Sequence, residues 1–288
     1  MCGLSVQTQP SMPIIKTPAS FIPLIVPREH PNPTTLLFRG DELLVRASDL
    51  SPADEAGCVL VADASRQYHA VGELGSRYFR VRWVARDTAP ADGYTFRKLR
   101  SLLGVLDEPS IAIAGRAYQI AEWARTHCYC GACGARTESV AGERCAKCVE
   151  CGMVAYPRIS PAMMVLIRNG DAILLARHTA SPTGRFSALA GFLEAGESIE
   201  EAVHREVFEE VRLQIHNLCY FGSQSWPFPH SLMIAFTADY LSGDITIDPS
   251  EIAEARWYGP NDTLPEYAPD VSIAGHLIQS HLKMVWGR

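Results

Sequence analysis

The chain has 288 residues, of which 47% are hydrophobic and 20% are charged. This composition is sufficient for a folded core and excludes an intrinsically disordered protein, while the length is typical of about two domains. The formal net charge of -6 excludes a protein that coats nucleic acid through overall positive charge. No apolar run approaches the ~20 residues of a membrane span, and the first residues lack the features of a signal peptide. We therefore expect a cytoplasmic protein with no membrane partner.

The first part of the chain is predicted to be a β-rich domain over residues 1–126. A proline-rich lead-in precedes short β-type runs, separated by turn residues, at 35–39, 42–45, 58–61, 69–71 and 78–84. Helices are predicted over residues 94–103 and 109–124, the second with a proline at its start. This region holds no compact set of chemically reactive residues, so we interpret it as a folding or dimerisation domain.

Six of the nine cysteines fall between positions 128 and 151, which indicates a metal site rather than a disulfide scaffold. Two Cys-x2-Cys pairs, formed by Cys130, Cys133, Cys148 and Cys151, have the spacing of two turns that hold one tetrahedral zinc ion. Pairing Cys145 with Cys148 is an alternative register, but only the outer assignment gives two equal turns. The sequence therefore predicts a zinc ribbon over residues 127–157, in which a closed four-sulfur site stabilises the fold and does not catalyse.

After the ribbon, strands alternate with helices, which indicates an α/β domain over residues 158–288. Asn169-Gly170 between two apolar runs predicts a hairpin of residues 163–167 and 172–176. Ser198 and Glu201 form a capping box that predicts the start of a helix with apolar residues at every fourth position. Further strands are predicted over 218–222, 233–240 and 245–247, and a last helix over 272–285.

The helix that begins at Ser198 is unusually acidic. Glu206, Glu209 and Glu210 stand at positions i, i+3 and i+4 and so share one face. Like charges at this spacing destabilise a helix by about 0.2–0.5 kcal/mol per pair. One interpretation is a solvated face, although such faces normally alternate with lysine. The other is that divalent cations neutralise the cluster, and oxygen ligands of this kind suit Mg²⁺ or Mn²⁺.

The residues around this cluster resemble the Nudix box, whose family hydrolyses nucleoside diphosphates linked to another moiety. The match runs Gly191-x5-Glu197-x7-Arg205-Glu206-Val207-x-Glu209-Glu210-x-x-Leu213. It departs from the family at Arg212, where a glycine usually turns the backbone after the helix, so we expect that turn to be reshaped or strained. The resemblance implies a mixed-sheet α/β/α sandwich, preceded here by the ribbon and the β-rich domain.

The same resemblance implies a metal-dependent pyrophosphohydrolase. Bound cations neutralise the pyrophosphate oxygens and lower the pKa of the attacking water. The implied ligands of Mg²⁺ or Mn²⁺ are the carboxylates of Glu206, Glu209, Glu210 and Glu251 and the carbonyl of Ala190. Glu209 is either a ligand or part of the base system, whereas Glu210 is the first candidate to orient and activate the water. Arg205 is expected to pair with a neighbouring carboxylate and hold it in place.

A second motif narrows the substrate. Residues 223–231, SQSWPFPHS, resemble the S-Q-P-W-P-F-P-x-S motif of the NADH pyrophosphatase (NAD-capped RNA decapping) branch, in which a four-cysteine ribbon precedes the Nudix domain. That branch implies hydrolysis of NAD(H) to NMN(H) and AMP, removal of the NAD cap from RNA 5′ ends to leave 5′-monophosphate RNA, and a homodimer. The residues at its substrate-pocket positions are Glu143, Tyr156, Phe192, Gln224, Trp226, Phe228, Ser231 and Ala274. Trp226 and Phe228 are expected to stack on a base, although without the resemblance they would be interpreted as a packed apolar loop.

Several alternatives stay open at the level of sequence. A Nudix enzyme specific for ADP-ribose or an oxidised nucleotide would keep the glutamates but would not need the second motif. A non-enzymatic nucleotide or RNA sensor could dispense with the glutamates. The sequence does not choose between free NADH and NAD-capped RNA as the main substrate, between Mg²⁺ and Mn²⁺, or among the glutamates for the base.

Overall fold

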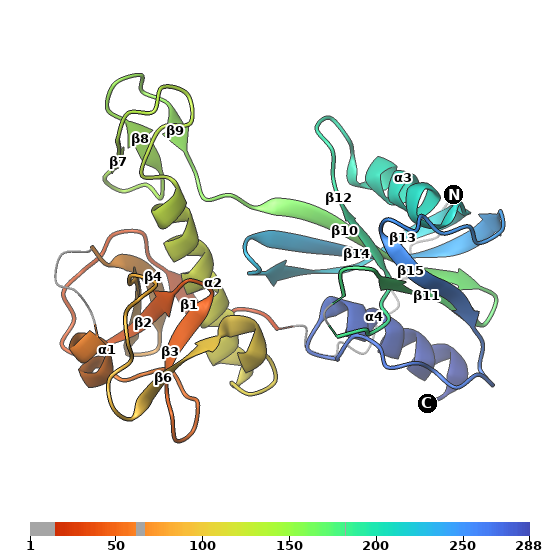
Figure 1. Ribbon diagram of the computed structural model, residues 1–288, viewed down its shortest axis with the longest axis horizontal. Coiled ribbons are helices and arrows are strands. Elements are labelled where there is room, and N and C mark those ends of the chain that lie inside the picture. The colour runs from red at the N-terminus through yellow and green to blue at the C-terminus, as the bar shows by residue number, and fades with distance from the viewer. Residues whose placement is uncertain (1–14, 62–66, 182) are drawn as a thin grey trace. The chain divides into compact units, whose positions relative to one another are not determined.

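The computed structural model describes residues 15–61, 67–181 and 183–288 (Figure 1). The chain divides into an N-terminal unit, residues 16–159 with 225–231, and a C-terminal unit, residues 160–224 with 232–288. Each unit is described by itself. Among the described residues, no helix has both the length and the apolar character that crossing a membrane requires. The division into domains 1–126, 127–157 and 158–288 stays a prediction.

The N-terminal unit is built on a six-stranded sheet. Its strands are β1 (Phe21–Pro23), β2 (Pro33–Arg39), β3 (Glu42–Arg46), β4 (His69–Leu74), β5 (Arg77–Trp83) and β6 (Tyr94–Lys98), in the order β1-β4-β5-β2-β3-β6. The β2–β5 pair is parallel and the other pairs are antiparallel. The proline-rich lead-in thus supplies a short edge strand at 21–23, while residues 1–14 lie outside the described part of the chain.

Two helices pack against this sheet, α1 (Glu55–Val61) and α2 (Glu108–Thr126). Successive side chains of a strand point to opposite faces, so Leu37 packs in the core beside Cys58 of α1. Its neighbour Phe38 contacts Tyr118 of α2, with ring centroids 5.3 Å apart. The predicted helix over 109–124 is therefore confirmed, and its N-cap is Asp107, which accepts a hydrogen bond from the backbone N–H of Ser110.

Two predictions in this unit were wrong. Residues 58–61, predicted as a strand, belong to α1, because Asp54 accepts a hydrogen bond from the backbone N–H of Gly57 and so caps a helix start. Residues 94–103, predicted as a helix, form β6 and a short 3₁₀ helix, η1 (Leu99–Leu102). Pairing of β6 with β3 supplies hydrogen bonds at the sheet edge, and this tertiary context overrides the local helical pattern.

The ribbon is a three-stranded antiparallel sheet of the N-terminal unit. It consists of β7 (Thr137–Ser139), β8 (Ala146–Cys148) and β9 (Val154–Ala155), with β8 in the centre. One loop with Cys-x2-Cys spacing precedes β7, and the other joins β8 to β9.

The C-terminal unit is a mixed sheet between two helices, as the sequence predicted. Its strands are β10 (Ser160–Asn169), β11 (Ala172–His178), β13 (Gln214–Trp226), β14 (Ser231–Ser242) and β15 (Ile252–Tyr258), in the order β13-β14-β10-β11-β15, with β12 (Leu189–Phe192) pairing β10. On β10, Met163, Val165 and Ile167 pack in the core with α3 (Ile199–Val211). The alternate Met164 and Leu166 pack with α4 (Ile273–His281), so the helices cover opposite faces (Figure 1).

Several local predictions in this unit are confirmed. Strands β10 and β11 form the hairpin about Asn169-Gly170, and the capping box of Ser198 and Glu201 is complete. The last helix is α4, followed by a π-helical turn over Leu282–Trp286.

The prediction of a strand over residues 245–247 was wrong. Instead, the backbone N–H groups of Thr246 and Asp248 donate to the carbonyls of Val211 and Glu210, each at 3.0 Å. The last carbonyls of a helix have no partner within the helix, so this segment satisfies the end of α3 rather than a strand.

Candidate active site and zinc ribbon

The carboxylates of three glutamates come together at the C-terminal half of α3. Glu206 and Glu210 are one turn apart and are only 8% and 2% exposed. Glu251 joins them because the backbone bond between Asp248 and Glu210 draws its loop onto the helix end. One carboxylate oxygen from each of the three lies within 4.8 Å of the others. The structure therefore brings together three of the four carboxylates that the sequence predicted as metal ligands.

The electrostatics of this cluster favour a cation. Burial raises the pKa of Glu210 to about 8, and the neighbouring charges of Glu206, Glu251 and Glu209 add to the shift. Burial also raises the pKa of Glu206, although Arg205 partly opposes this. Oε2 of Glu210 is buried and receives no hydrogen bond from any group in the described part of the chain. A divalent cation bound by oxygen ligands would satisfy this atom, so the donor set fits Mg²⁺ or Mn²⁺.

The strand beside α3 leaves room for these carboxylates. A Cβ atom added at Gly191 would lie 2.0 Å from Cδ of Glu206. The box therefore requires a glycine at position 191, because the side chain of Glu206 approaches the backbone of β12 closely. Ala190 is the preceding residue of that strand.

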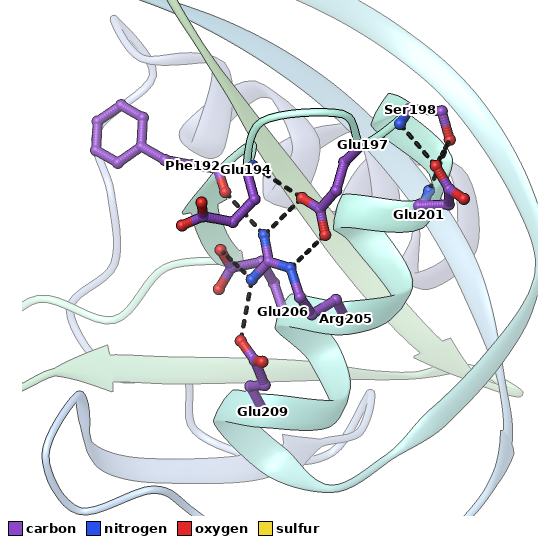
Figure 2. Close-up of polar contacts among 8 residues, drawn as sticks. All are labelled: Phe192, Glu194, Glu197, Ser198, Glu201, Arg205, Glu206 and Glu209. Carbon is purple, nitrogen blue, oxygen red and sulfur yellow. Dashed lines mark hydrogen bonds and ion pairs between the residues drawn. The ribbon is translucent and has the colours of Figure 1, made fainter.

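Arg205 organises the exposed side of the helix (Figure 2). Its Nη2 and Nε atoms donate to the carboxylate of Glu197 at 2.9 and 2.5 Å, and Nη2 also donates to the carbonyl of Phe192 at 3.0 Å. Its Nη1 lies 3.0 Å from Oε1 of Glu206 and 2.9 Å from Oε2 of Glu209. The bonds from Arg205 lower the pKa of Glu197 to about 2. The guanidinium therefore ties the loop after β12 to two glutamates of the cluster face.

Glu209 differs from the other glutamates. Its side chain is 55% exposed and pairs with Arg205. Among the described residues, its carboxylate is not one of the three whose oxygens lie within 4.8 Å of one another.

The ribbon loops have equal geometry. The backbone N–H of Gly134 donates to the carbonyl of Cys130 at 2.9 Å, and that of Gly152 donates to the carbonyl of Cys148 at 3.2 Å, so the same bond closes both loops. The sulfurs of Cys133 and Cys148 are 3.4 Å apart, and those of Cys130 and Cys151 are 3.6 Å apart. Sulfurs that surround zinc at about 2.3 Å stand roughly 3.8 Å apart, so this arrangement fits a tetrahedral zinc site.

Cys145, one of the two other ribbon cysteines, lies elsewhere. Cys145 is 2% exposed and its Sγ donates to the carboxylate of Glu143 at 3.6 Å, which takes it out of the group of four sulfurs. Oε2 of Glu143 also accepts a hydrogen bond from the hydroxyl of Tyr156 at 3.1 Å. Two of the predicted substrate residues are therefore in contact in the N-terminal unit.

The two aromatic residues of the second motif also belong to the N-terminal unit. The rings of Trp226 and Phe228 meet edge to face with centroids 5.0 Å apart, and both are half-buried. The guanidinium of Arg100 lies 4.5 Å from the ring centroid of Phe228 and 5.7 Å from that of Trp226. Pro227 between them packs against Gly115 of α2, where an added Cβ would lie 2.9 Å away. The rings are thus held beside a cation rather than inside an apolar core.

The other predicted substrate residues have different surroundings. Phe192 is 59% exposed at the end of β12, whereas Ser231 and Ala274 are buried. Gln224 is also buried: its Oε1 accepts from the backbone N–H of Ile273 at 2.8 Å, and its Nε2 donates to the carbonyl of Val271 at 3.0 Å. Gln224 therefore fixes the start of α4, where Ala274 lies.

Sequence reasoning missed two contributors to these sites. No local pattern indicated that Arg100, in a 3₁₀ helix 128 residues before Phe228, would lie beside the rings of Trp226 and Phe228. Asp248 lies three residues before Glu251, the expected metal ligand. Its backbone hydrogen bond to the end of α3 depends on the tertiary fold and could not be predicted from the local sequence.

Comparisons with known proteins agree with this architecture. A NUDIX domain model matches residues 158–279, and a model of the NADH pyrophosphatase-like rudimentary NUDIX domain matches residues 34–123. The NAD-capped RNA hydrolase NudC of Pseudomonas syringae is 47% identical over 199 residues, which cover 69% of this chain and 71% of that protein. The NAD-capped RNA hydrolase NudC of Pseudomonas aeruginosa is 46% identical over 66% of this chain and 68% of that protein.

A crystal structure of a NUDIX hydrolase from Nitrosomonas europaea is similar at a TM-score of 0.48 and 21% identity, over 56% of this chain and 93% of that one. The two family models together cover both the N-terminal sheet and the glutamate helix. The chain therefore belongs to the Nudix hydrolases, as a pyrophosphohydrolase of the branch that carries an NADH pyrophosphatase-like rudimentary Nudix domain.

Proposed function

We propose that this enzyme hydrolyses the pyrophosphate bond of NAD(H) to give NMN(H) and AMP, and that it removes the NAD cap from RNA 5′ ends to leave 5′-monophosphate RNA. The cluster formed by the buried Glu206 and Glu210 with the exposed Glu251 carries the hydrolytic part of this proposal, because carboxylates collected at such a site need a cation. The substrate is supported by the curated relatives, which are NAD-capped RNA hydrolases, and by the rudimentary domain at residues 34–123.

The proposed metal ligands are the carboxylates of Glu206, Glu209, Glu210 and Glu251 and the carbonyl of Ala190. Bound Mg²⁺ or Mn²⁺ would neutralise the pyrophosphate oxygens and lower the pKa of the attacking water. Glu210 is our candidate to orient that water and accept its proton, since one of its carboxylate oxygens has no partner among the described residues. Arg205 would hold the carboxylates of Glu206 and Glu209 in fixed orientations through the ion pairs shown in Figure 2.

Recognition of the dinucleotide is assigned to a separate set of residues. We propose that Phe192, Trp226 and Phe228 offer aromatic faces to its bases, and that Glu143 and Tyr156 bind polar groups of the substrate. Gln224, Ser231 and Ala274 complete the proposed set. For Gln224 the bonds to the start of α4 support a role in shaping the pocket wall.

The remaining parts of the proposal concern the zinc and the assembly. Cys130, Cys133, Cys148 and Cys151 would hold one structural zinc per chain, which the sulfur geometry supports. We also propose, on the basis of family resemblance, that the protein is a cytoplasmic homodimer. Light scattering of the purified protein would measure the mass of the assembly and so test the dimer.

The decisive experiment is incubation with NADH and Mn²⁺, followed by chromatographic separation of NMNH and AMP. Glu210→Gln keeps the size of the side chain but removes its charge, so we expect kcat to fall about 10²–10⁴-fold with KM little changed. Glu200→Gln, on an exposed position of the same helix, is the matched control and should retain normal turnover. Near-normal turnover of Glu210→Gln would rule out the carboxylate mechanism.

The same assay separates the two substrates. Comparing kcat/KM for NADH with that for a short NAD-capped RNA shows which one the enzyme prefers. Products other than NMN(H) and AMP, or preference for ADP-ribose over both, would favour a different Nudix specificity.

A further inference from the structure

A tight loop of the ribbon presents Glu143. The backbone N–H of Glu143 donates to the carbonyl of Val140 at 3.2 Å, and that of Val140 donates to the carbonyl of Cys145 at 3.3 Å. Gly142 adopts a φ of +80°, a value that side chains disfavour. The loop is thus closed on itself, and its three functional side chains, those of Glu143, Arg144 and Cys145, are consecutive.

Arg144 connects this loop to the sheet of the N-terminal unit. Its Nη1 donates to the carbonyl of Ala70 in β4 at 3.0 Å, and its Nη2 donates to the carbonyl of Leu24, just after β1, at 2.5 Å. These two carbonyls are fixed relative to each other, because β1 and β4 are paired and the N–H of Leu24 bonds to Val71. A planar guanidinium that donates to two fixed acceptors has a defined orientation.

No carboxylate among the described residues forms an ion pair with Arg144. Burial lowers its pKa, and the nearby charge of Arg116 lowers it further. A half-buried arginine with carbonyl partners alone contributes less Coulomb energy than one paired with a carboxylate, so the placement of Arg144 is better explained by what it holds in position.

Cys145 constrains Glu143 from the other side. Its buried thiol donates to Oε2 of Glu143, the atom that also accepts from the hydroxyl of Tyr156. The bond to Glu143 raises the pKa of Tyr156, and burial followed by the same carboxylate raises that of Cys145. Both donors stay protonated at neutral pH, so the carboxylate of Glu143 retains two fixed donors.

We infer that Arg144 and Cys145 are positioning residues for substrate binding: they fix the carboxylate of Glu143, and through Arg144 the rudimentary Nudix sheet sets the orientation of the recognition loop in the ribbon. The inference rests on the proposed function, in which Glu143 binds the dinucleotide. A preorganised carboxylate loses less conformational entropy on binding, so the effect belongs to KM.

The test uses the full-length, zinc-loaded protein and steady-state kinetics with NADH. Arg144→Met keeps the length of the side chain but removes both donors, and Cys145→Ala removes the thiol. We expect each to raise KM about 5- to 20-fold with kcat within about twofold of the parent. Arg144→Lys has one donor group that cannot span both carbonyls, and Cys145→Ser keeps a donor, so each should restore part of the loss. Lys147→Met, at an exposed position of β8, is the matched control and should leave KM unchanged.

Double variants show whether these residues act through Glu143. Glu143→Gln alone should raise KM, and adding Cys145→Ala or Arg144→Met to it should cause little further change. Additive effects, or unchanged KM in Cys145→Ala and Arg144→Met while Glu143→Gln raises it, would overturn the positioning role and leave the proposed function intact. An unchanged KM in Glu143→Gln would instead remove the substrate role of Glu143. If Arg144→Met does not fold, the Cys145 series decides alone.

Discussion

At the scale of single residues, the carboxyl of Glu210 is the least well satisfied group of the candidate active site. It is 2% exposed, three other glutamates contribute like charge, and one of its oxygens receives no hydrogen bond within the described residues. Burying a charge without a partner is strongly unfavourable, so the carboxyl holds its proton until a cation replaces it. This competition between a proton and a metal ion predicts a specific pH dependence of stability.

We expect the free energy of unfolding to fall as pH rises from about 4.5 to 8 when the glutamate site is free of divalent cations. Over that range the folded state keeps a proton on Glu210, whose pKa is raised to about 8, while the unfolded chain has released it near the ordinary value of 4.5. The contribution of Glu210 to stability is therefore fully present below the pKa of the unfolded state and is lost as pH rises through the pKa of the folded state. Urea unfolding at a series of pH values measures this, in protein that retains its zinc.

Glu210→Gln is the control for that measurement, because an amide cannot release the proton. Its unfolding free energy should depend less steeply on pH, and adding Mg²⁺ should raise the stability of the parent more than that of the variant at pH 8. Identical pH slopes for parent and variant would contradict the assigned pKa.

Arg212 is the residue at which the chain departs from the Nudix box. It caps α3 with a φ of 60° and a ψ of 23°, as expected for a turn that the family builds with glycine. A side chain in this left-handed region costs on the order of 1 kcal/mol. The guanidinium lies 5.1 Å from the ring centroid of Phe208, a contact that offsets part of this strain.

We expect Arg212→Gly to raise Tm by a few degrees without a change in turnover, as thermal unfolding and the NADH assay can measure. Arg212→Ala loses the ring contact but keeps the strained backbone, so it should melt below Arg212→Gly. If the alanine variant is the more stable of the two, backbone strain is not what the glycine relieves.

At the scale of elements, the ribbon is a small sheet with few buried apolar residues, so we expect its fold to depend on the metal. Its two cysteine loops are closed by the same backbone bond, from Gly134 to Cys130 and from Gly152 to Cys148, and the thiol of Cys145 donates to Glu143 instead. The geometry therefore supports the outer cysteine register over the one that would use Cys145.

We expect protein purified without added metal to contain about one zinc per chain by elemental analysis. Cys148→Ser should lose the zinc and much of the stability, because the binding free energy of a structural zinc is part of the folding free energy. Cys145→Ser should keep the zinc. The opposite pattern, with zinc lost in Cys145→Ser and retained in Cys151→Ser, would show that the inner register is correct.

At the scale of the whole molecule, the proposed metal ligands and the two aromatic residues of the second motif lie in different compact units. The glutamate cluster lies in the C-terminal unit, whereas Trp226 and Phe228 pack in the N-terminal unit with Arg100. Trp226 and Phe228 can therefore be altered while the metal ligands stay intact.

We expect Trp226→Ala to lower kcat/KM for NADH by an amount equal to roughly 1–3 kcal/mol, the usual contribution of stacking on one base. The loss should be smaller for ADP-ribose, which lacks the nicotinamide ring, and the dependence of rate on Mn²⁺ should not change. Equal losses with both substrates would mean that Trp226 supports the fold or stacks on adenine. A changed Mn²⁺ dependence would mean that the two units do not act separately.

The sequence determined the features that depend on neighbouring residues. The capping box at Ser198, the hairpin at Asn169-Gly170 and the paired cysteine spacing each place their backbone through contacts only a few residues apart. The left-handed turn at Arg212 followed in the same way from its position after the helix. Such features depend on covalent geometry and local hydrogen bonds, so a short segment contains all the information they need.

Tertiary structure alone decided the rest. Residues 94–98 form a strand because pairing with β3 outweighed their local helical propensity, and residues 58–61 form a helix in which Cys58 packs in the core beside Leu37. Residues 245–248 satisfied the end of α3 instead of extending a sheet, and this brought Glu251 to Glu210. Arg100 and Arg144 reached their partners across 128 and up to 120 residues of chain, respectively. Burial and long-range hydrogen bonds depend on the whole packed fold, and a sequence read one segment at a time does not contain them.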